Sequence, residues 1–234
     1  LLSRTPIVSA ASLLDVAPKF VNETSNSVWD AVAALIADLK FYFPALDPDF
    51  PKFQEYVAKI VRPGLNRLGL LPKKNESDDD MKLRQTLIGF SLYADDVDVV
   101  AELAELYDAN FEKMHPEIRY YILSAKFKAE EESNFSDYLE RYRKENDPEV
   151  KSELLSVISE AKHHTDELLD LLKDPKTIKP QDHLYLFIYM ARSPYAHTAA
   201  VKWLYNNWDY IVEKVPSLRE NNGVYGVVYG CQEL

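Results

Sequence analysis

The sequence predicts an all-α fold, namely a HEAT- or armadillo-like α-solenoid made of antiparallel helix pairs. Apolar residues recur at three- and four-residue steps along most of the chain, which is the spacing of one face of a helix. Only 6 of the 234 residues are glycine, whereas a sheet-rich fold with many tight turns needs more. The expected helix starts, taken in pairs, repeat at roughly 30 to 40 residues, as in helical-repeat proteins. They lie near residues 77, 96, 116, 134, 148, 165, 180 and 194.

Two helices are expected before the first of these starts. Residues 25–43 carry one apolar stripe, and residues 47–69 carry a second. Pro63 and Gly64 are expected to kink or break the second helix, because proline lacks the backbone donor and crowds the preceding turn. Gly69 suits the end of this helix, since glycine adopts the left-handed conformation without steric cost.

The joint that follows, NRLGLLPKKNESDDDMKLRQ (residues 66–85), combines a basic loop with a strong helix start. Ser77 is expected to cap the next helix, and the three aspartates after it place negative charge at the positive end of the helix dipole. Asp80 lies three residues after Ser77, which makes a variant of the capping box. Together the cap and the charges are worth about 1–2 kcal/mol, enough to fix where the helix begins.

The later helices are marked by residues suited to a first helical turn. One helix is expected over about residues 97–113, and another in SNFSDYLERYRKEN (133–146). Proline is common at a first helical position because its missing N–H would have no partner there. The other starts are Pro116, Pro148, Thr165, Pro180 and Pro194, the last of these for a helix that reaches residue 215. Residues 217–234 hold three of the six glycines and are expected to form an irregular tail.

Composition argues against several classes of function. The formal net charge is −11, so nucleic acid is not an expected partner, because phosphate binding needs a basic surface. No run of 18 apolar residues occurs, so no membrane span is expected. The chain starts with neither a methionine nor a secretory signal, and we expect it to be one helical-repeat domain, residues 1–234, cut from a longer protein.

Motifs that would carry catalysis or hold a metal are absent from the sequence. None of the five histidines stands in H-E-x-x-H, the arrangement that binds zinc in peptidases. His163 and His164 are adjacent and would point about 100° apart on a helix, so we interpret them as part of a polar loop. Cys231 has no histidine near it in sequence, and neither G-x-S-x-G nor a phosphate loop occurs. We therefore expect no catalytic residue, no metal ligand and no cofactor in this chain.

Five segments point together to one protein family: VW…LIADLKFYF, RPGLNRLGLLPKKNESDDDMKLR, PEIRYYIL, TIKPQDHLYLFIYMARS and AVKWLYNNWDYI. In order and approximate spacing they resemble the C-terminal helical domain of zinc aminopeptidases of the aminopeptidase N family. The resemblance covers about residues 12–215, and KPQD (179–182) is most similar to the enzymes of lactic-acid bacteria. The family usually has tryptophan where this sequence has Leu70.

The resemblance implies a division of labour. A separate upstream domain carries H-E-x-x-H and the zinc, while the helical domain curves over the active site, restricts entry and contacts the far part of the peptide. This chain would then be a C-terminal fragment of a longer cytoplasmic enzyme and would not cleave peptides by itself. Its partners would be the upstream catalytic domain and peptide substrates. A stand-alone helical-repeat scaffold that binds another protein is the alternative interpretation.

Basic residues are candidates for peptide contact, because some relatives attract the C-terminal carboxylate of a peptide with basic side chains. The candidates are Arg84, Lys162 and Arg192. The planar guanidinium suits a carboxylate. The two arginines also match family positions whose role is structural, such as closing a helix end, and the lysine only lies near a basic position, so a structural role is favoured for all three. Aromatic residues on expected helices belong to the core or line a peptide-binding hollow: Tyr120, Tyr121, Tyr185, Phe187 and Tyr189.

Overall fold

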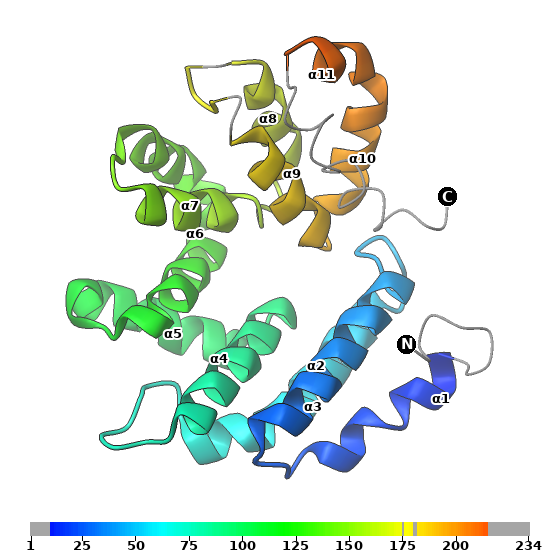
Figure 1. The fold of residues 1–234 in the computed structure, drawn as a ribbon, viewed down its shortest axis with the longest axis vertical. Helices are drawn as coiled ribbons and strands as arrows, with labels where there is room; N and C mark the ends of the chain where they lie inside the picture. The colour runs from blue at the N-terminus through cyan, green and yellow to red at the C-terminus, as the bar shows by residue number, and fades with distance from the viewer. Residues whose placement is uncertain (1–9, 175, 180–181, 215–234) are drawn as a thin grey trace. The chain divides into compact units, whose positions relative to one another are not determined.

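The structure is a computed structural model that describes residues 10–174, 176–179 and 182–214 (Figure 1). Every regular element in these ranges is a helix, so the predicted all-α class is confirmed. The predicted tail at 217–234 and the predicted start at Pro180 lie outside the described residues. The α-helices are α1 (Ala10–Leu14), α2 (Asn26–Leu39), α3 (Phe50–Leu68), α4 (Asp78–Tyr93), α5 (Val97–Asn110), α6 (Pro116–Lys144), α7 (Pro148–Ile158), α8 (Thr165–Asp170), α9 (His183–Arg192), α10 (His197–Asn206) and α11 (Trp208–Lys214). The 3-10 helices are η2 (Ala17–Phe20), η3 (Lys40–Tyr42), η4 (Phe111–Lys113) and η5 (Leu171–Lys173).

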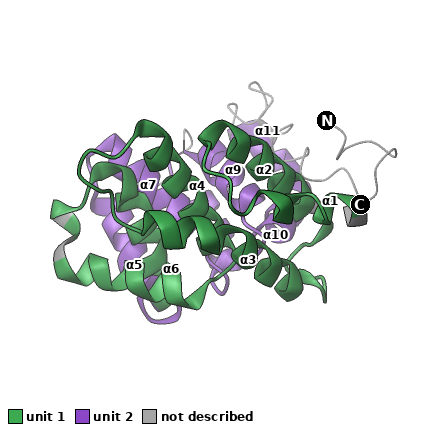
Figure 2. Ribbon diagram, turned by 90° about the horizontal axis from the view of Figure 1, so that it is seen from below, with its two compact units in different colours: residues 1–129 green, residues 130–234 purple. Residues whose placement is uncertain are grey.

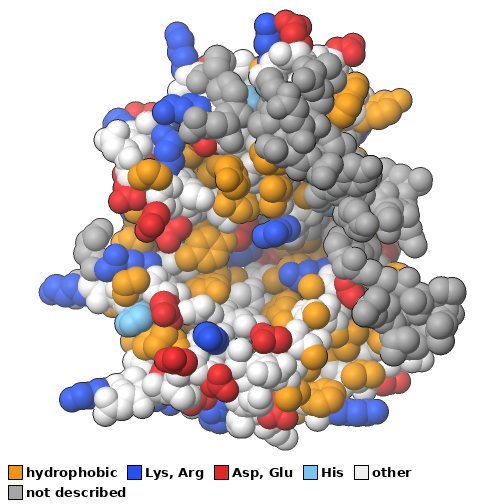
Figure 3. All heavy atoms as spheres, viewed as in Figure 1, with side chains coloured by type: hydrophobic (Ala, Val, Ile, Leu, Met, Phe, Trp, Pro, Cys, Tyr) orange, Lys and Arg blue, Asp and Glu red, His pale blue; other side chains and the backbone are white. Residues whose placement is uncertain are grey.

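The chain forms two compact units, residues 1–129 and 130–234, and the boundary between them lies within α6 (Figure 2). On the face drawn in Figure 3, acidic and basic side chains are intermixed with hydrophobic ones.

In the first unit, α2, α3 and α4 bury their apolar stripes against one another. The fully buried residues at this contact include Trp29, Ile36, Val57, Leu83 and Leu87.

The proline within α3 does not interrupt the helix. Pro63 lies inside α3, which continues to Leu68, so the break is excluded, and the kink that was the other predicted outcome stays a prediction. Proline removes one helical hydrogen bond, but Val61 and Leu65 on either side of it are buried, and packing of this apolar face holds the helix together. Gly69 ends α3 as predicted, with φ 74° and its N–H donating to the Leu65 carbonyl at 2.7 Å.

The start of α4 also confirms its prediction. The Ser77 hydroxyl accepts the N–H of Asp80 at 3.1 Å, and α4 begins at Asp78. The Asp80 carboxylate accepts from Arg67 Nη1 at 2.9 Å. Asp80, which was expected to support the cap, therefore also links the start of α4 to the last turn of α3.

A left-handed residue turns the chain between α4 and α5. Asp95 has φ 50°, which is uncommon for a residue other than glycine. Its carboxylate accepts from Gln54 Nε2 of α3 at 3.1 Å and pairs with Lys128 Nζ of α6 at 3.3 Å. Asp96 pairs with Arg62 of α3 at 2.6 Å. These contacts tie the turn to two helices.

Helix α6, which contains the boundary between the two units, differs from its prediction. It runs from Pro116 to Lys144 without interruption, so the helix start expected near residue 134 is wrong. The polar residues around Asn134 have a start-like composition, but buried side chains follow at helical spacing and keep the segment in one helix. These are Phe135, Tyr138, Leu139 and Tyr142.

The last helices follow the predicted order with different limits. The starts at Pro148 and Thr165 are confirmed, and Asp147 caps α7 through a hydrogen bond from the N–H of Glu149 at 2.9 Å. The helix expected from Pro194 begins three residues later, at His197. It ends at Asn206, and a separate helix, α11, begins at Trp208. Helix α9 packs against both α7 and α10 in this unit (Figure 1).

Candidate functional site

One face of α9 presents two tyrosines and an arginine. Tyr185, Tyr189 and Arg192 stand at positions i, i+4 and i+7, which lie on the same side of a helix. Tyr185 is 54% exposed, Tyr189 is half-buried and Arg192 is exposed. The opposite side carries the buried residues Leu186, Phe187 and Met190, which fix the orientation of the helix. We refer to Tyr185, Tyr189 and Arg192 as the α9 face.

The α9 face is held by contacts with its neighbours. The hydroxyls of Tyr189 and Ser152 of α7 lie 3.2 Å apart and share a hydrogen bond. On the buried side, the ring of Phe187 lies 5.6 Å from the ring of Trp203 of α10, measured between centroids. Two of the five aromatic residues considered from the sequence thus take different roles: Phe187 is a core residue, and Tyr185 is on the surface.

Arg192 lies in the last turn of α9, where a cation also complements the negative end of the helix dipole. Within the described residues, no side chain or carbonyl accepts a hydrogen bond from its guanidinium. This arrangement fits both the predicted peptide contact and the structural alternative.

Lys162 lies in the loop between α7 and α8, and its ammonium is 4.7 Å from the centre of the Tyr195 ring, a cation–π contact. The loop itself is fixed on α6. The N–H of His163 donates to Glu131 Oε1 at 2.7 Å, and the ring of His164 stacks on Phe135 at 4.3 Å. Tyr195, whose ring lies beside Lys162, is in the turn that follows α9.

Arg84 occupies a different kind of position, in the first unit. Its side chain is fully buried, and its Nε donates to the carbonyl of Gly69 at 3.0 Å. Both terminal nitrogens donate to the carboxylate of Glu76, and one also reaches the Leu68 carbonyl at 3.4 Å. The Arg84 guanidinium holds the pKa of Glu76 below its ordinary value, although burial acts in the other direction. This geometry closes the end of α3 and fixes the loop before α4.

The histidines have partners other than a metal. His164 Nδ1 lies 3.1 Å from Glu167 Oε2, and His163 Nε2 lies 3.6 Å from Glu132 Oε1. Across the described residues, no three His, Cys, Asp or Glu side chains are grouped as metal ligands would be. The residues that the structure describes therefore do not provide the grouped ligands of a zinc site.

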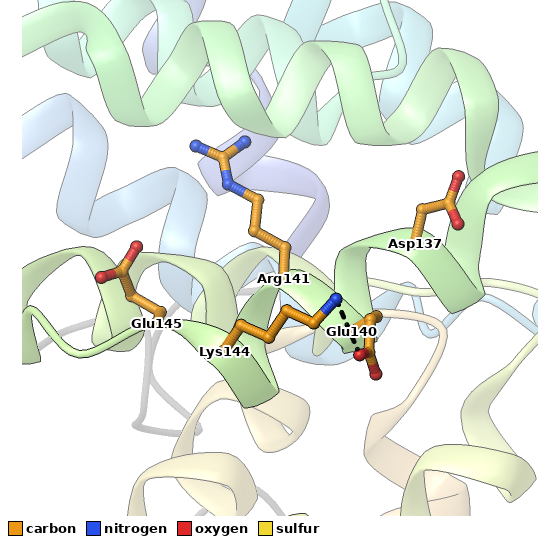
Figure 4. Close-up of a pocket in the computed structure, with 5 residues that line it drawn as sticks. All are labelled: Asp137, Glu140, Arg141, Lys144 and Glu145. Carbon is orange, nitrogen blue, oxygen red and sulfur yellow. Dashed lines mark ion pairs between the residues drawn. The ribbon is translucent and has the colours of Figure 1, made fainter.

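A shallow surface hollow lies along the end of α6 (Figure 4). All of its lining residues come from one short stretch of chain, and Lys144 Nζ pairs with Glu140 Oε1 at 3.1 Å. In Figure 4 the Arg141 side chain points away from this pair, so the charged groups do not converge on one point. The hollow is lined by Asp137, Glu140, Arg141, Lys144 and Glu145.

Comparison with known proteins decides the family. The family model described as "ERAP1-like C-terminal domain" matches residues 1–231. The chain belongs to this family. The predicted resemblance to the C-terminal domain of aminopeptidase N is thereby confirmed.

This ERAP1-like domain is similar to parts of longer peptidases. Aminopeptidase N of Lactococcus lactis subsp. lactis (strain IL1403) is 28% identical over 221 residues, which cover 92% of this chain and 26% of that protein. Aminopeptidase N of Lactobacillus helveticus is 24% identical over 92% of this chain, again with 26% of the relative covered. Glutamyl aminopeptidase of Bitis rhinoceros is 23% identical over 91% of this chain and 23% of its own length. The chain thus spans about a quarter of the length of these relatives.

Some features of the ERAP1-like domain carry a signal in its sequence, and others do not. The helical spacing of Tyr185, Tyr189 and Arg192 is a signal that predicts a shared face. The contacts of Ser152 and Tyr195 carry no such signal, because they join segments that are far apart in the chain.

Considering the described part of the chain, no helix has the length and apolar character needed to cross a bilayer.

Proposed function

We propose that this chain is the C-terminal domain of a zinc aminopeptidase, where it covers the active site and shapes the access of peptides. Its membership of the ERAP1-like C-terminal domain family supports this most directly. The match to about a quarter of each relative leaves room for a catalytic domain elsewhere in the same polypeptide. In this proposal the chain does not cleave peptide bonds, and the upstream domain holds the zinc. A cytoplasmic location stays a prediction that rests on the resemblance alone.

We propose further that the helices form antiparallel pairs of a HEAT-like array. The packing of consecutive helices α3 and α4 in the first unit, and of α9 and α10 in the second, supports this arrangement. The buried Arg84 and Glu76 then have a structural task, which is to fix the loop that joins α3 to α4. Such arrays bind their partners along an extended surface.

The α9 face is the part of this surface that we assign to peptides. An exposed guanidinium with no acceptor in the described chain can take both oxygens of a carboxylate, such as a peptide's C-terminus. The tyrosines at positions 185 and 189 offer an apolar ring and a hydroxyl to any peptide backbone, whatever its sequence. Lys162 against Tyr195 adds a second cation in the same unit.

The test compares long and short substrates of the full-length enzyme. Arg192→Ala is expected to raise KM for peptides of about nine residues roughly 3- to 10-fold, because a charge-assisted hydrogen bond is worth about 1.5 kcal/mol and an exposed ion pair less than about 1. Dipeptides are too short to reach both the catalytic centre and a distant arginine, so their turnover stays unchanged. Lys202→Ala, which removes an exposed cation of α10, is the matched control. Equal effects of Arg192→Ala on both lengths, or no effect on either, would take Arg192 out of the peptide-binding surface.

A further inference from the structure

The first residue of α9 is a buried histidine. His183 is 2% exposed, and its Nε2 lies 3.1 Å from the carbonyl oxygen of Ile178. A carbonyl oxygen only accepts hydrogen bonds, so Nε2 is the donor and carries the ring's proton. This hydrogen bond ties the first turn of α9 to the segment that precedes it.

The other ring nitrogen has no such support. His183 Nδ1 is buried and has no hydrogen-bond partner within the described residues. In the neutral ring it is an acceptor, and leaving a neutral acceptor unpaired costs less than burying an unpaired charge. Adding a proton there would bury both a charge and an unsatisfied donor, which is far more costly.

The surroundings do not provide a compensating anion of sufficient strength. Burial lowers the pKa of His183, and it outweighs the Ile178 carbonyl and the neighbouring Asp182, which both act to raise it. The Asp182 carboxylate already accepts a hydrogen bond from the Tyr142 hydroxyl at 3.1 Å.

Four other titratable side chains on α6, α7 and α10 are not among the groups that shift the pKa of His183. Lys151 of α7 lies over the Tyr142 ring at 4.7 Å, and Arg143 of α6 donates to the Thr177 hydroxyl at 3.1 Å. Lys202 of α10 is exposed to solvent, and His197 stands at the first position of α10. Burial, the Ile178 carbonyl and Asp182 are the influences that act on the His183 ring.

We propose that His183 is a pH-sensitive switch for the start of α9. The neutral ring holds the first turn of the helix against Ile178. Protonation expels the ring from its buried place and breaks the hydrogen bond that holds that turn to Ile178. Tyr185 follows two residues later, so the α9 face would lose its fixed position at low pH; this consequence rests on the proposed function, whereas the switch itself does not.

The direction of the pH effect follows from the lowered pKa. The unfolded or locally opened chain takes up a proton at the ordinary histidine value of 6.5, whereas the folded chain resists it. The stabilisation by His183 is therefore complete above pH 6.5. The stabilisation is lost as the pH falls from 6.5 toward the lower pKa of His183 in the folded chain. Over this range the equilibrium constant for local opening rises about tenfold for each pH unit.

The experiment follows amide hydrogen exchange of α9 by mass spectrometry in the full-length protein at pH 7.5 and 5.5. His183→Gln keeps an N–H group that can donate to Ile178 but does not titrate in this range. After correction for the intrinsic exchange rate, native α9 is expected to open more at pH 5.5, and the variant is expected to show a clearly smaller change. His115→Gln, which alters an exposed histidine of the first unit, should behave like the native protein.

An equal pH response of α9 in the native protein and in His183→Gln would overturn the proposal. If the variant does not fold, exchange at the ring carbon between the two nitrogens reports the titration of His183 in the native protein, and a midpoint at or above 6.5 would also overturn it. Turnover of long peptides provides a separate arm. A pH-dependent opening of α9 without any change in long-peptide turnover keeps the switch and contradicts the assignment of the α9 face to peptides.

Discussion

Arg84 and Glu76 place two opposite charges where water scarcely reaches, with side chains 1% and 6% exposed. Taking both charges out of water is costly, and the pair is favourable only because its geometry is good and the remaining donors are used. Arg84 meets this condition, since it also donates to the carbonyls of Gly69 and Leu68. The arrangement therefore fixes the loop shape strongly, whatever its net contribution to stability.

Removing one partner should show how strongly the loop depends on this pair. Glu76→Gln leaves the Arg84 charge buried without a counter-charge, and we expect it to lower the free energy of unfolding by about 3–5 kcal/mol. Arg67→Ala is the control, because Arg67 and Asp80 form a pair that is 39% and 33% exposed, worth less than about 1 kcal/mol. Urea denaturation of the native chain and both variants measures the difference.

The stabilisation by the Arg84–Glu76 pair should also depend on pH. Because the pKa of Glu76 is lowered in the fold, its stabilisation is present above the ordinary value of 4.5 and is lost as the pH falls below it. Denaturation curves between pH 6 and pH 3 should therefore fall more steeply for the native chain than for Glu76→Gln. A Glu76→Gln variant as stable as Arg67→Ala, with the same acid response as the native chain, would contradict the assignment.

At the scale of helices, α3 and α4 meet where a glycine leaves room for a leucine. A Cβ atom at Gly64 would lie 2.5 Å from Leu87 Cδ1, and Leu87 is fully buried. A Cβ at Gly89 would lie 3.5 Å from the Tyr121 ring, which is an ordinary contact. Both glycines are inside helices, where alanine is favoured by about 1 kcal/mol.

These two glycines should respond to alanine with opposite signs. Gly64→Ala is expected to destabilise by up to about 2 kcal/mol, because overpacking costs about 1–3 kcal/mol and the gain in helix propensity offsets about 1 kcal/mol of this. Gly89→Ala is expected to stabilise by up to about 1 kcal/mol. Thermal or urea unfolding measures both, and in a Leu87→Ala background the penalty at Gly64 should vanish. Stabilisation by Gly64→Ala in the native background would show that Leu87 yields easily and that the contact is loose.

Helices were predictable where a signal is local. Gly69 and Ser77 mark their helix ends through backbone freedom and a short side chain, and both act within a few residues. Pro63 and the segment near Asn134 carry equally local signals that point to breaks, yet α3 and α6 continue. In both helices, buried side chains from the fold outweigh the local preference.

Some features of the candidate site could also be predicted from local signals in the sequence, and others could not. The helical spacing of Tyr185, Tyr189 and Arg192 is enough to predict that they share a face. The contact of Arg84 with Glu76 depends on the shape of the loop between α3 and α4. The hydrogen bond from His183 to the Ile178 carbonyl depends on the backbone before α9. A single sequence does not specify such loop geometry, so these partners could not be predicted.

At the scale of the whole molecule, the chain spans about a quarter of the length of the aminopeptidases that it matches. In the described residues, the histidines nearest to carboxylates make pairs, and no three ligands are grouped for a metal. The division proposed above assigns binding and access to this part and the cleavage step to another. Activity should therefore follow the upstream domain and not this one.

The 234-residue chain, purified alone, is expected to release no nitroaniline from aminoacyl-nitroanilides, with or without added zinc. The full-length protein is expected to hydrolyse them and to lose this activity on treatment with a chelator, because the metal supplies the activated water. Folding of the isolated chain must be checked by its helical circular dichroism, so that inactivity is not caused by unfolding. Chelator-sensitive turnover that stays with the folded chain through every purification step would mean that a catalytic centre lies within these 234 residues, and the proposed division would be wrong.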